Sequence, residues 1–94
     1  MPHIDDWMVP LPAGSVELRG RLGAALERSI ANRLKKVNYP HLVDPFRLRN
    51  ECDGKWRCEF WGKIVRSAIF SWRGSRDEEL LQMIRETVAD LLST

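Results

Sequence analysis

The sequence predicts an all-α protein of three helices, the last two of which form an αα-hairpin. Three stretches carry apolar residues at the spacing of one helix face, near residues 16–37, 59–73 and 76–93. No stretch has a convincing strand pattern, and only two residues separate the second and third stretches, which favours the hairpin. We therefore expect an extended lead-in over residues 1–14 and one helical domain over residues 15–94.

The first helix is predicted from a long apolar stripe that follows a proline-rich start. Prolines restrict their own backbone and that of the preceding residue, so the first 14 residues should be extended. Ser15 is a suitable N-cap, and Asn38 and Pro40 are expected to close the helix. Two glycines weaken its first turns, so its firm part should be near 21–37. The stripe consists of Leu18, Leu22, Leu26, Ile30, Leu34 and Val37.

The second helix should follow a long connection over residues 39–57. A link of this length inside a compact domain usually carries function or packs over other elements. Gly74 readily adopts the left-handed conformation that stops a helix, which places the end near residue 73. Apolar residues surround much of the helix, so we expect it to be buried on more than one side. They are Phe60, Trp61, Ile64, Val65, Ala68, Ile69, Phe70 and Trp72.

The third helix is predicted to begin with a capping box. Ser75 and Glu78 have the spacing that lets each side chain bond the backbone of the other. Asp77 and Glu79 would also lie in the first turn, where the helix dipole favours anions. The apolar stripe that continues the helix consists of Leu80, Leu81, Ile84, Val88, Leu91 and Leu92.

Composition indicates a small folded domain with an uneven charge. Hydrophobic residues make up 44% of the 94 residues and charged residues 30%, which is ordinary for a globular protein and unlike a disordered one. The charge is −3 over residues 1–18, +9 over residues 19–76 and −4 over residues 77–94. The basic middle could attract an anion or a nucleic acid. Because no recognition motif accompanies it, we favour a solvated helix surface and expect no nucleic-acid partner.

Signals for export or membrane insertion are not evident in the sequence. The acidic start lacks the basic and apolar regions of a signal peptide. Apolar runs reach only three residues, far short of a bilayer span. We therefore expect a cytoplasmic protein with no membrane partner.

The two cysteines are expected to be ordinary reduced thiols. Cys52 and Cys58 are separated by more residues than the pair in a zinc knuckle, and His3 and His41 are distant in sequence. A metal site built from these four residues is the less favoured alternative, and a disulfide across the short loop would need an oxidant. We expect no cofactor in this chain.

The most informative stretch is Glu59-Phe60-Trp61-Gly62-Lys63, which closely follows Trp56. Indole faces stack on sugar C–H groups and charged groups hydrogen-bond sugar hydroxyls, so this mixture suits a carbohydrate-facing surface. However, aromatic residues at helical spacing are more often part of a core, and a carboxylate in the first turn often serves only the helix dipole. Both interpretations stay open at this point.

Shorter motifs accompany this stretch along the chain. They are Gly20-Arg21-Leu22-Gly23, Asn32-Arg33, Val43-Asp44-Pro45-Phe46-Arg47 and Ser67-Ala68. Together with the run from Glu59 to Lys63, they resemble the N-terminal portion of bacterial glycoside hydrolase family 127, the β-L-arabinofuranosidase-like proteins. The similarity extends over about residues 15–93. One departure is Ile64, where an aromatic residue commonly follows the lysine.

This resemblance implies an (α/α)6-barrel catalytic domain acting on glycosides, of which this chain would supply the opening helices. In the family, the nucleophilic cysteine, its zinc-coordinating partners and the acid/base glutamate lie well downstream of this region. The resemblance therefore implies zinc only for the full-length family protein, no catalytic residue here, and an N-terminal fragment that is inactive alone. The candidate sugar-binding residues are Glu59, Trp61, Trp56, Arg47 and Glu51.

The alternative is a free-standing three-helix module that binds a protein or a nucleic acid. A complete module should cover its own apolar stripes, whereas a barrel fragment should leave an apolar helix face open. The broad apolar surface of the second helix favours the fragment. We expect carbohydrate as the ligand of the completed barrel, and self-association through apolar helix faces for the isolated chain.

Overall fold

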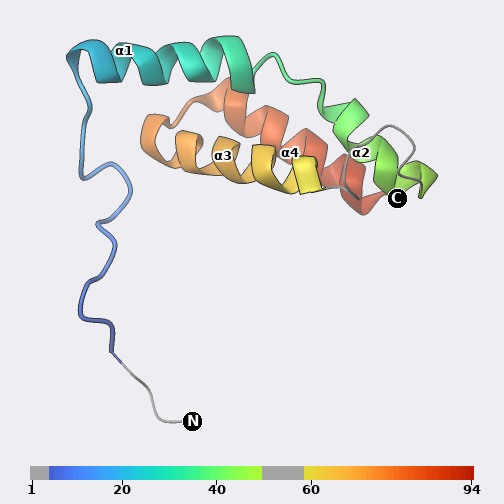
Figure 1. The fold of residues 1–94 in the computed structure, drawn as a ribbon, viewed down its shortest axis with the longest axis horizontal. Coiled ribbons are helices and arrows are strands. Elements are labelled where there is room, and N and C mark those ends of the chain that lie inside the picture. Colours follow the sequence, from blue (N-terminus) through green and yellow to red (C-terminus); the bar gives the residue numbers. More distant parts are fainter. Residues whose placement is uncertain (1–4, 50–58) are drawn as a thin grey trace.

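All regular secondary structure in the computed structural model, which describes residues 5–49 and 59–94, is helical (Figure 1). The elements are α1 (Gly20–Ser29), the π-helical turn η1 (Ile30–Leu34), α2 (Tyr39–Leu48), α3 (Glu59–Ser75) and α4 (Glu78–Leu92). The all-α prediction is confirmed, and no strand occurs among the described residues. The expected number of three helices is wrong, because the described ranges contain four α-helices.

The first helix is shorter than predicted and changes its pitch. It begins at Gly20, whose φ of 63° is left-handed, and Arg19 precedes it without a side-chain cap. Ser15, the predicted cap, instead donates from Oγ to the carbonyl of Pro12 in an exposed turn. From Ile30 the helix widens into η1, where Lys35 N–H bonds the Ile30 carbonyl five residues back.

The predicted connection over residues 39–57 is wrong in its first half, where α2 forms. Asn38 caps this helix by accepting a bond from His41 N–H, and Pro40 lies in the first turn, where its missing N–H costs nothing. Asn38 and Pro40 therefore open α2, although they were expected to close the preceding helix. Residues 50–57 of the predicted connection lie outside the described residues.

The hairpin between α3 and α4 is present, but other residues shape its turn. Gly74 lies within α3 rather than ending it, and Arg76 takes the left-handed conformation with φ of 57°. The guanidinium of Arg76 lies 4.7 Å from the centre of the Trp72 ring, a cation–π contact at the turn. Asp77, rather than Ser75, caps α4 by accepting the Leu80 N–H at 2.9 Å.

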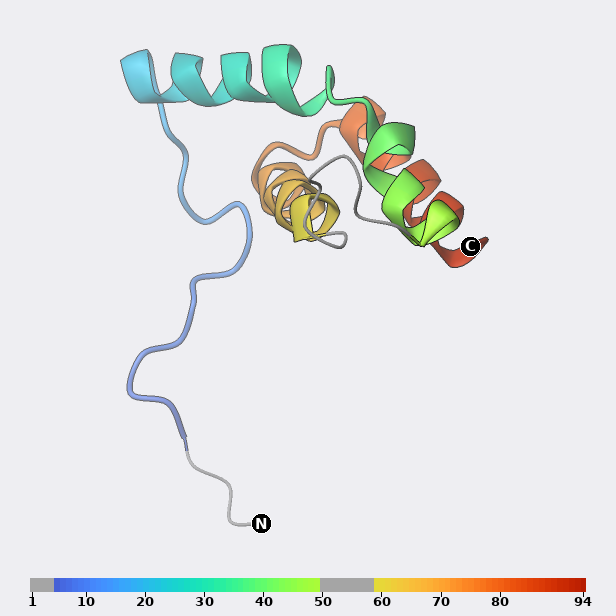
Figure 2. The same cartoon turned by 45° about the vertical axis from the view of Figure 1, so that its right-hand side comes forward.

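The core lies where η1 and α2 cross the hairpin. Figures 1 and 2 show α1 running above the hairpin of α3 and α4, and α2 beside α4, while residues 5–19 extend away from the helices. The main cluster joins η1 to both hairpin helices through Ile30, Leu34, Ala68, Leu80 and Ile84. Tyr39, Val43 and Val65 are also buried.

The expectation that α3 is buried on more than one side is wrong within the described fold. Only the face that carries Val65 and Ala68 is covered. Phe60, Ile69 and Phe70 are exposed at other positions around the helix. Among the described elements, η1, α2 and α4 contact α3, and they leave the rest of its apolar surface open. No helix in the described part of the chain combines the length and hydrophobicity of a membrane span.

An ion-pair cluster joins the end of η1 to the start of α4. Lys35 Nζ lies 3.0 Å from Asp77 Oδ2 and 3.2 Å from Glu79 Oε2. Two hydrogen bonds lower the pKa of Asp77 below its ordinary value of 3.8: the larger effect comes from Leu80 N–H and the next from Lys35. The bonds to Asp77 and Glu79 raise the pKa of Lys35 above 10.5. Asp77 and Lys35 are thus both charged between these two values.

Replacing Asp77 with asparagine is expected to lower the melting temperature at neutral pH and to weaken its acid dependence. Asparagine keeps the cap but not the charge, whereas alanine loses both, so Asp77→Ala should melt lower still. Because the folded-state pKa of Asp77 is lowered, its charge stabilises the fold above pH 3.8 and this contribution is lost as the pH falls further. Thermal melts of the wild type and Asp77→Asn should therefore converge in acid, whereas Asp77→Ala should stay lower because it lacks the cap. Glu78→Gln, which alters the same turn without touching Lys35, is the control, and an equal effect of Glu78→Gln would contradict the assignment.

Candidate functional site

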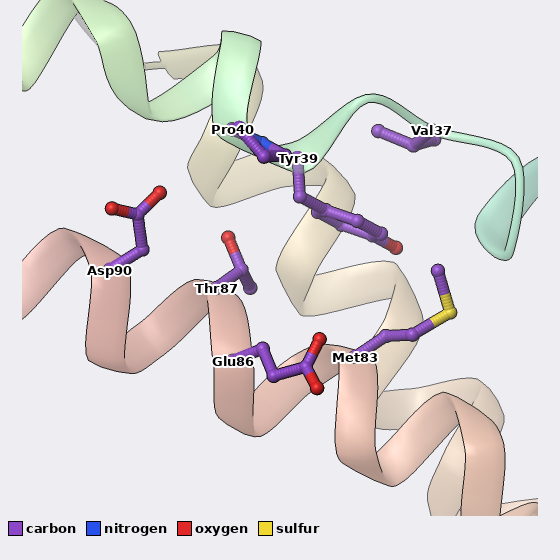
Figure 3. Close-up of a pocket in the computed structure, with 7 residues that line it drawn as sticks. All are labelled: Val37, Tyr39, Pro40, Met83, Glu86, Thr87 and Asp90. Atoms are coloured by element: carbon purple, nitrogen blue, oxygen red, sulfur yellow. The ribbon is translucent and has the colours of Figure 1, made fainter.

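The candidate site is a cleft of about 360 Å³ between the start of α2 and one face of α4 (Figure 3). Clefts of this size suit small ligands. One wall comes from Val37, in the turn between η1 and α2, and from the first turn of α2, and the other comes from successive turns of α4. The lining residues are Val37, Tyr39, Pro40, Met83, Glu86, Thr87 and Asp90.

Tyr39 forms the buried part of the cleft wall. Its hydroxyl donates to the Leu34 carbonyl at 2.7 Å, which satisfies a backbone group at the end of η1. Burial raises the pKa of the Tyr39 phenol, so the neutral hydroxyl that donates this bond is favoured. In Figure 3 the ring extends toward Met83, and the two side chains give this end of the cleft an apolar surface.

Thr87 connects the cleft to Trp61, one of the predicted sugar-binding residues. The Trp61 indole N–H donates to Thr87 Oγ1 at 2.9 Å, and Thr87 is buried. The Trp61 ring also meets Phe46 edge to face, with centroids 6.0 Å apart. The indole N–H of Trp61 and one edge contact of its ring are thus already used by other residues of the fold. This geometry favours the packing interpretation of Trp61 over sugar stacking.

Arg47, a second predicted site residue, is held against Asp90 at the opposite end of the cleft. Its guanidinium bonds both carboxylate oxygens of Asp90 and donates to Asp44 Oδ1 and to the Pro40 carbonyl. Asp90 first, and then Asp44, raise the pKa of Arg47, so the guanidinium stays charged. These bonds fasten α2 to α4 and give Arg47 a structural task.

Glu86 and Asp90 provide the acidic groups of the cleft. They lie one helical turn apart on α4, on either side of Thr87. Asp90 is neutralised by Arg47, and Glu86 accepts a bond from Gln82 at 3.1 Å on the exposed side. Carboxylate oxygens beside apolar side chains can accept hydrogen bonds from ligand hydroxyls while the apolar wall contacts C–H groups.

The remaining predicted site residues do not join this cleft. Glu59 is the first residue of α3, where its carboxylate pairs with Lys63 at 2.6 Å and faces solvent. Trp56 and Glu51 lie outside the described residues, as do Cys52 and Cys58. Among the described residues, no three His, Cys, Asp or Glu side chains gather in a group that could hold a metal ion.

Sequence reasoning did not find Tyr39, Glu86 or Asp90. Tyr39 was assigned to a connection because Asn38 and Pro40 were interpreted as helix-ending signals. The same pair, with asparagine as N-cap and proline in the first turn, is also a helix-start signal and could have placed Tyr39 on α2. Glu86 and Asp90 have helical spacing that is common on any solvated face, so nothing in the sequence distinguished them.

Comparisons with known proteins add no relative to this description. The chain matches no protein-family model, and searches of curated proteins and of solved structures give no significant match.

Replacing Thr87 with valine should lower the free energy of unfolding by about 1–2 kcal/mol. Valine keeps the shape of threonine but leaves the Trp61 N–H without its acceptor in a part-buried position. Urea titration measures the loss, and the indole N–H resonance of Trp61 should shift. Thr94→Val is the matched control, because Thr94 bonds only the Leu91 carbonyl at the exposed end of α4. Equal stability of the two variants would contradict a structural role for the Trp61–Thr87 bond.

Proposed function

We propose that this chain provides opening helices of a glycoside hydrolase barrel similar to family 127, acting on β-L-arabinofuranoside-like substrates. The observation that carries the proposal is the combination found on α3. This helix bears the Glu59-Phe60-Trp61-Gly62-Lys63 motif, and it leaves Phe60, Ile69 and Phe70 uncovered. In a barrel of helical hairpins, further helices would pack on that open surface.

In this proposal the described helices position a substrate and do not catalyse its hydrolysis. A glycosidase needs two suitably placed carboxyl groups, or a nucleophile with one acid. Within the described residues, Asp90 is tied to Arg47 and Glu59 to Lys63, and neither pair shows the apolar burial that tunes a catalytic acid. The cleft beside Thr87 would instead bind sugar hydroxyls. Trp61 and Arg47 would hold the cleft residues Thr87 and Asp90 in place through their hydrogen bonds.

The test compares the 94-residue chain with the product of the complete reading frame from which it comes. The isolated chain is expected to show no turnover of an aryl β-L-arabinofuranoside, and a longer product carrying further helical hairpins is expected to hydrolyse it. Glu59→Gln in the isolated chain is the control. If the 94-residue chain hydrolysed the substrate and Glu59→Gln abolished this activity, catalysis could no longer be assigned to residues outside this chain. A folded longer product without glycosidase activity would overturn the function itself.

A free-standing interaction module remains the second candidate, and one observation favours it. The helices close a core of their own, and every buried side-chain nitrogen and oxygen among the described residues has a hydrogen-bond partner. A fold that is stable without further helices or a partner is expected to have hydrogen bonds for all its buried polar groups. A module should be a monomer until its partner binds, whereas an incomplete barrel should associate with itself.

A further inference from the structure

A second groove, of about 420 Å³, lies between η1 and α3 and differs in character from the α2–α4 cleft. One side of the groove is formed by residues that follow one another along α3 at helical spacing, namely Phe60, Lys63, Ser67 and Ser71. The other side includes Ser29 and Arg33 at the π-helical turn. Among the described residues that line it, the groove therefore has two cations, three hydroxyls and one aromatic ring, and none of them carries a carboxylate.

The cations of this groove are available to a ligand. Arg33 has no ion-pair partner among the residues that the structure describes. Lys63 pairs with Glu59, but both side chains of that pair are largely exposed, so the interaction is weak and easily shared. Within the described part of the chain, the positive charge of Arg33 in this groove is therefore not neutralised by an ion pair.

The hydroxyls and the ring add recognition of a second kind. Ser67 Oγ donates to the Lys63 carbonyl at 3.0 Å, which leaves its oxygen lone pairs free to accept from a ligand hydroxyl. The partly exposed ring of Phe60 offers an apolar surface to C–H groups. The π-helical turn places Arg33 at the groove, and such turns are rare and often found at functional sites.

We propose that this groove binds a sugar bearing an anionic group, a carboxylate or a phosphate. The anion would bond the Arg33 guanidinium, whose planar fork matches such groups in two-point contact, with Lys63 adding charge. The sugar hydroxyls would bond the serines, and its C–H face would lie on Phe60. The inference rests on the proposed function, since it adds to the α2–α4 cleft a second carbohydrate-binding groove that takes a sugar unit with an anionic group.

The test is an NMR titration of the full chain with glucuronate, galacturonate and glucose 6-phosphate. Glucose, acetate and inorganic phosphate are titrated in parallel, so that the sugar and the anion are separated. The anionic sugars should shift the amide resonances of Arg33, Ser67 and Ser71 and bind about tenfold more tightly than glucose, as expected for one charge-assisted contact. The uronates and the sugar phosphate then show which anion is preferred.

Arg33→Gln should reduce the affinity for the anionic sugars about tenfold. Arg28→Gln is the matched control, because Arg28 is an exposed cation near the end of α1 that does not line the groove. Glucose binding as tightly as glucuronate would overturn the anionic specificity and leave the carbohydrate function standing. The site would be overturned if acetate or phosphate bound as tightly as the anionic sugars, or if no anionic sugar bound at all. It would also be overturned if Arg33→Gln bound the anionic sugars with the affinity of the wild type.

Discussion

Replacing Leu80 with alanine is expected to lower the free energy of unfolding by about 3 kcal/mol. Leu80 has no exposed surface and sits where α4 meets η1 and α3, so its truncation removes contacts on several sides at once. A chain of 94 residues has a small core, and its total stability should lie near the lower end of the usual 5–15 kcal/mol. The substitution should therefore remove a large share of the stability of the fold.

Urea denaturation followed by circular dichroism measures this loss. Leu92→Ala is the matched control, since Leu92 is 80% exposed on the same helix and its truncation should change stability by less than about 0.5 kcal/mol. A loss at Leu80 no larger than that at Leu92 would mean that the contact of α4 with η1 and α3 does not carry the core.

The isolated chain is expected to associate at micromolar concentration, and polar substitutions on α3 are expected to abolish this association. The exposed fractions of Phe60, Ile69 and Phe70 are 39%, 39% and 57%, around a helix that the other elements cover on one side only. Burying one large apolar side chain contributes about 1.5–3 kcal/mol, so burying several together is enough to hold two chains together. The double change Ile69→Gln and Phe70→Gln should leave the core intact and yield a monomer.

Light scattering and sedimentation velocity on the wild type and the double variant test this prediction. The control is the double change Val9→Gln and Leu11→Gln, which removes still more exposed apolar side chains from the segment before α1. This control should associate as the wild type does. A monomeric wild type of high thermal stability would remove the main physical support for the barrel proposal, and the interaction module would then be the better candidate.

Local pattern was sufficient to predict the last two helices of the chain. The span of α3 begins at the predicted residue Glu59, and α4 lies within the predicted range 76–93. Both have a full apolar face, and such periodicity depends only on the order of residues along the chain. The hairpin followed for the same reason, since so short a link leaves two adjacent helices few alternatives to packing side by side.

Tertiary structure alone decided whether a capping signal started or ended a helix. It also decided which of the predicted site residues contact one another. Asn38 and Pro40 are compatible with either a helix end or a helix start, and α2 forms because Tyr39 and Val43 become buried against the rest of the fold. The sequence predicted Arg47 and Trp61 as sugar-binding residues, and in the structure they bond Asp90 and Thr87 on α4, far along the chain. The sequence by itself determined that Trp61, Thr87 and Asp90 lie on helices, whereas it placed Arg47 in a connection. Whether a polar side chain binds a ligand or another helix depends on contacts between distant segments, which no local pattern records.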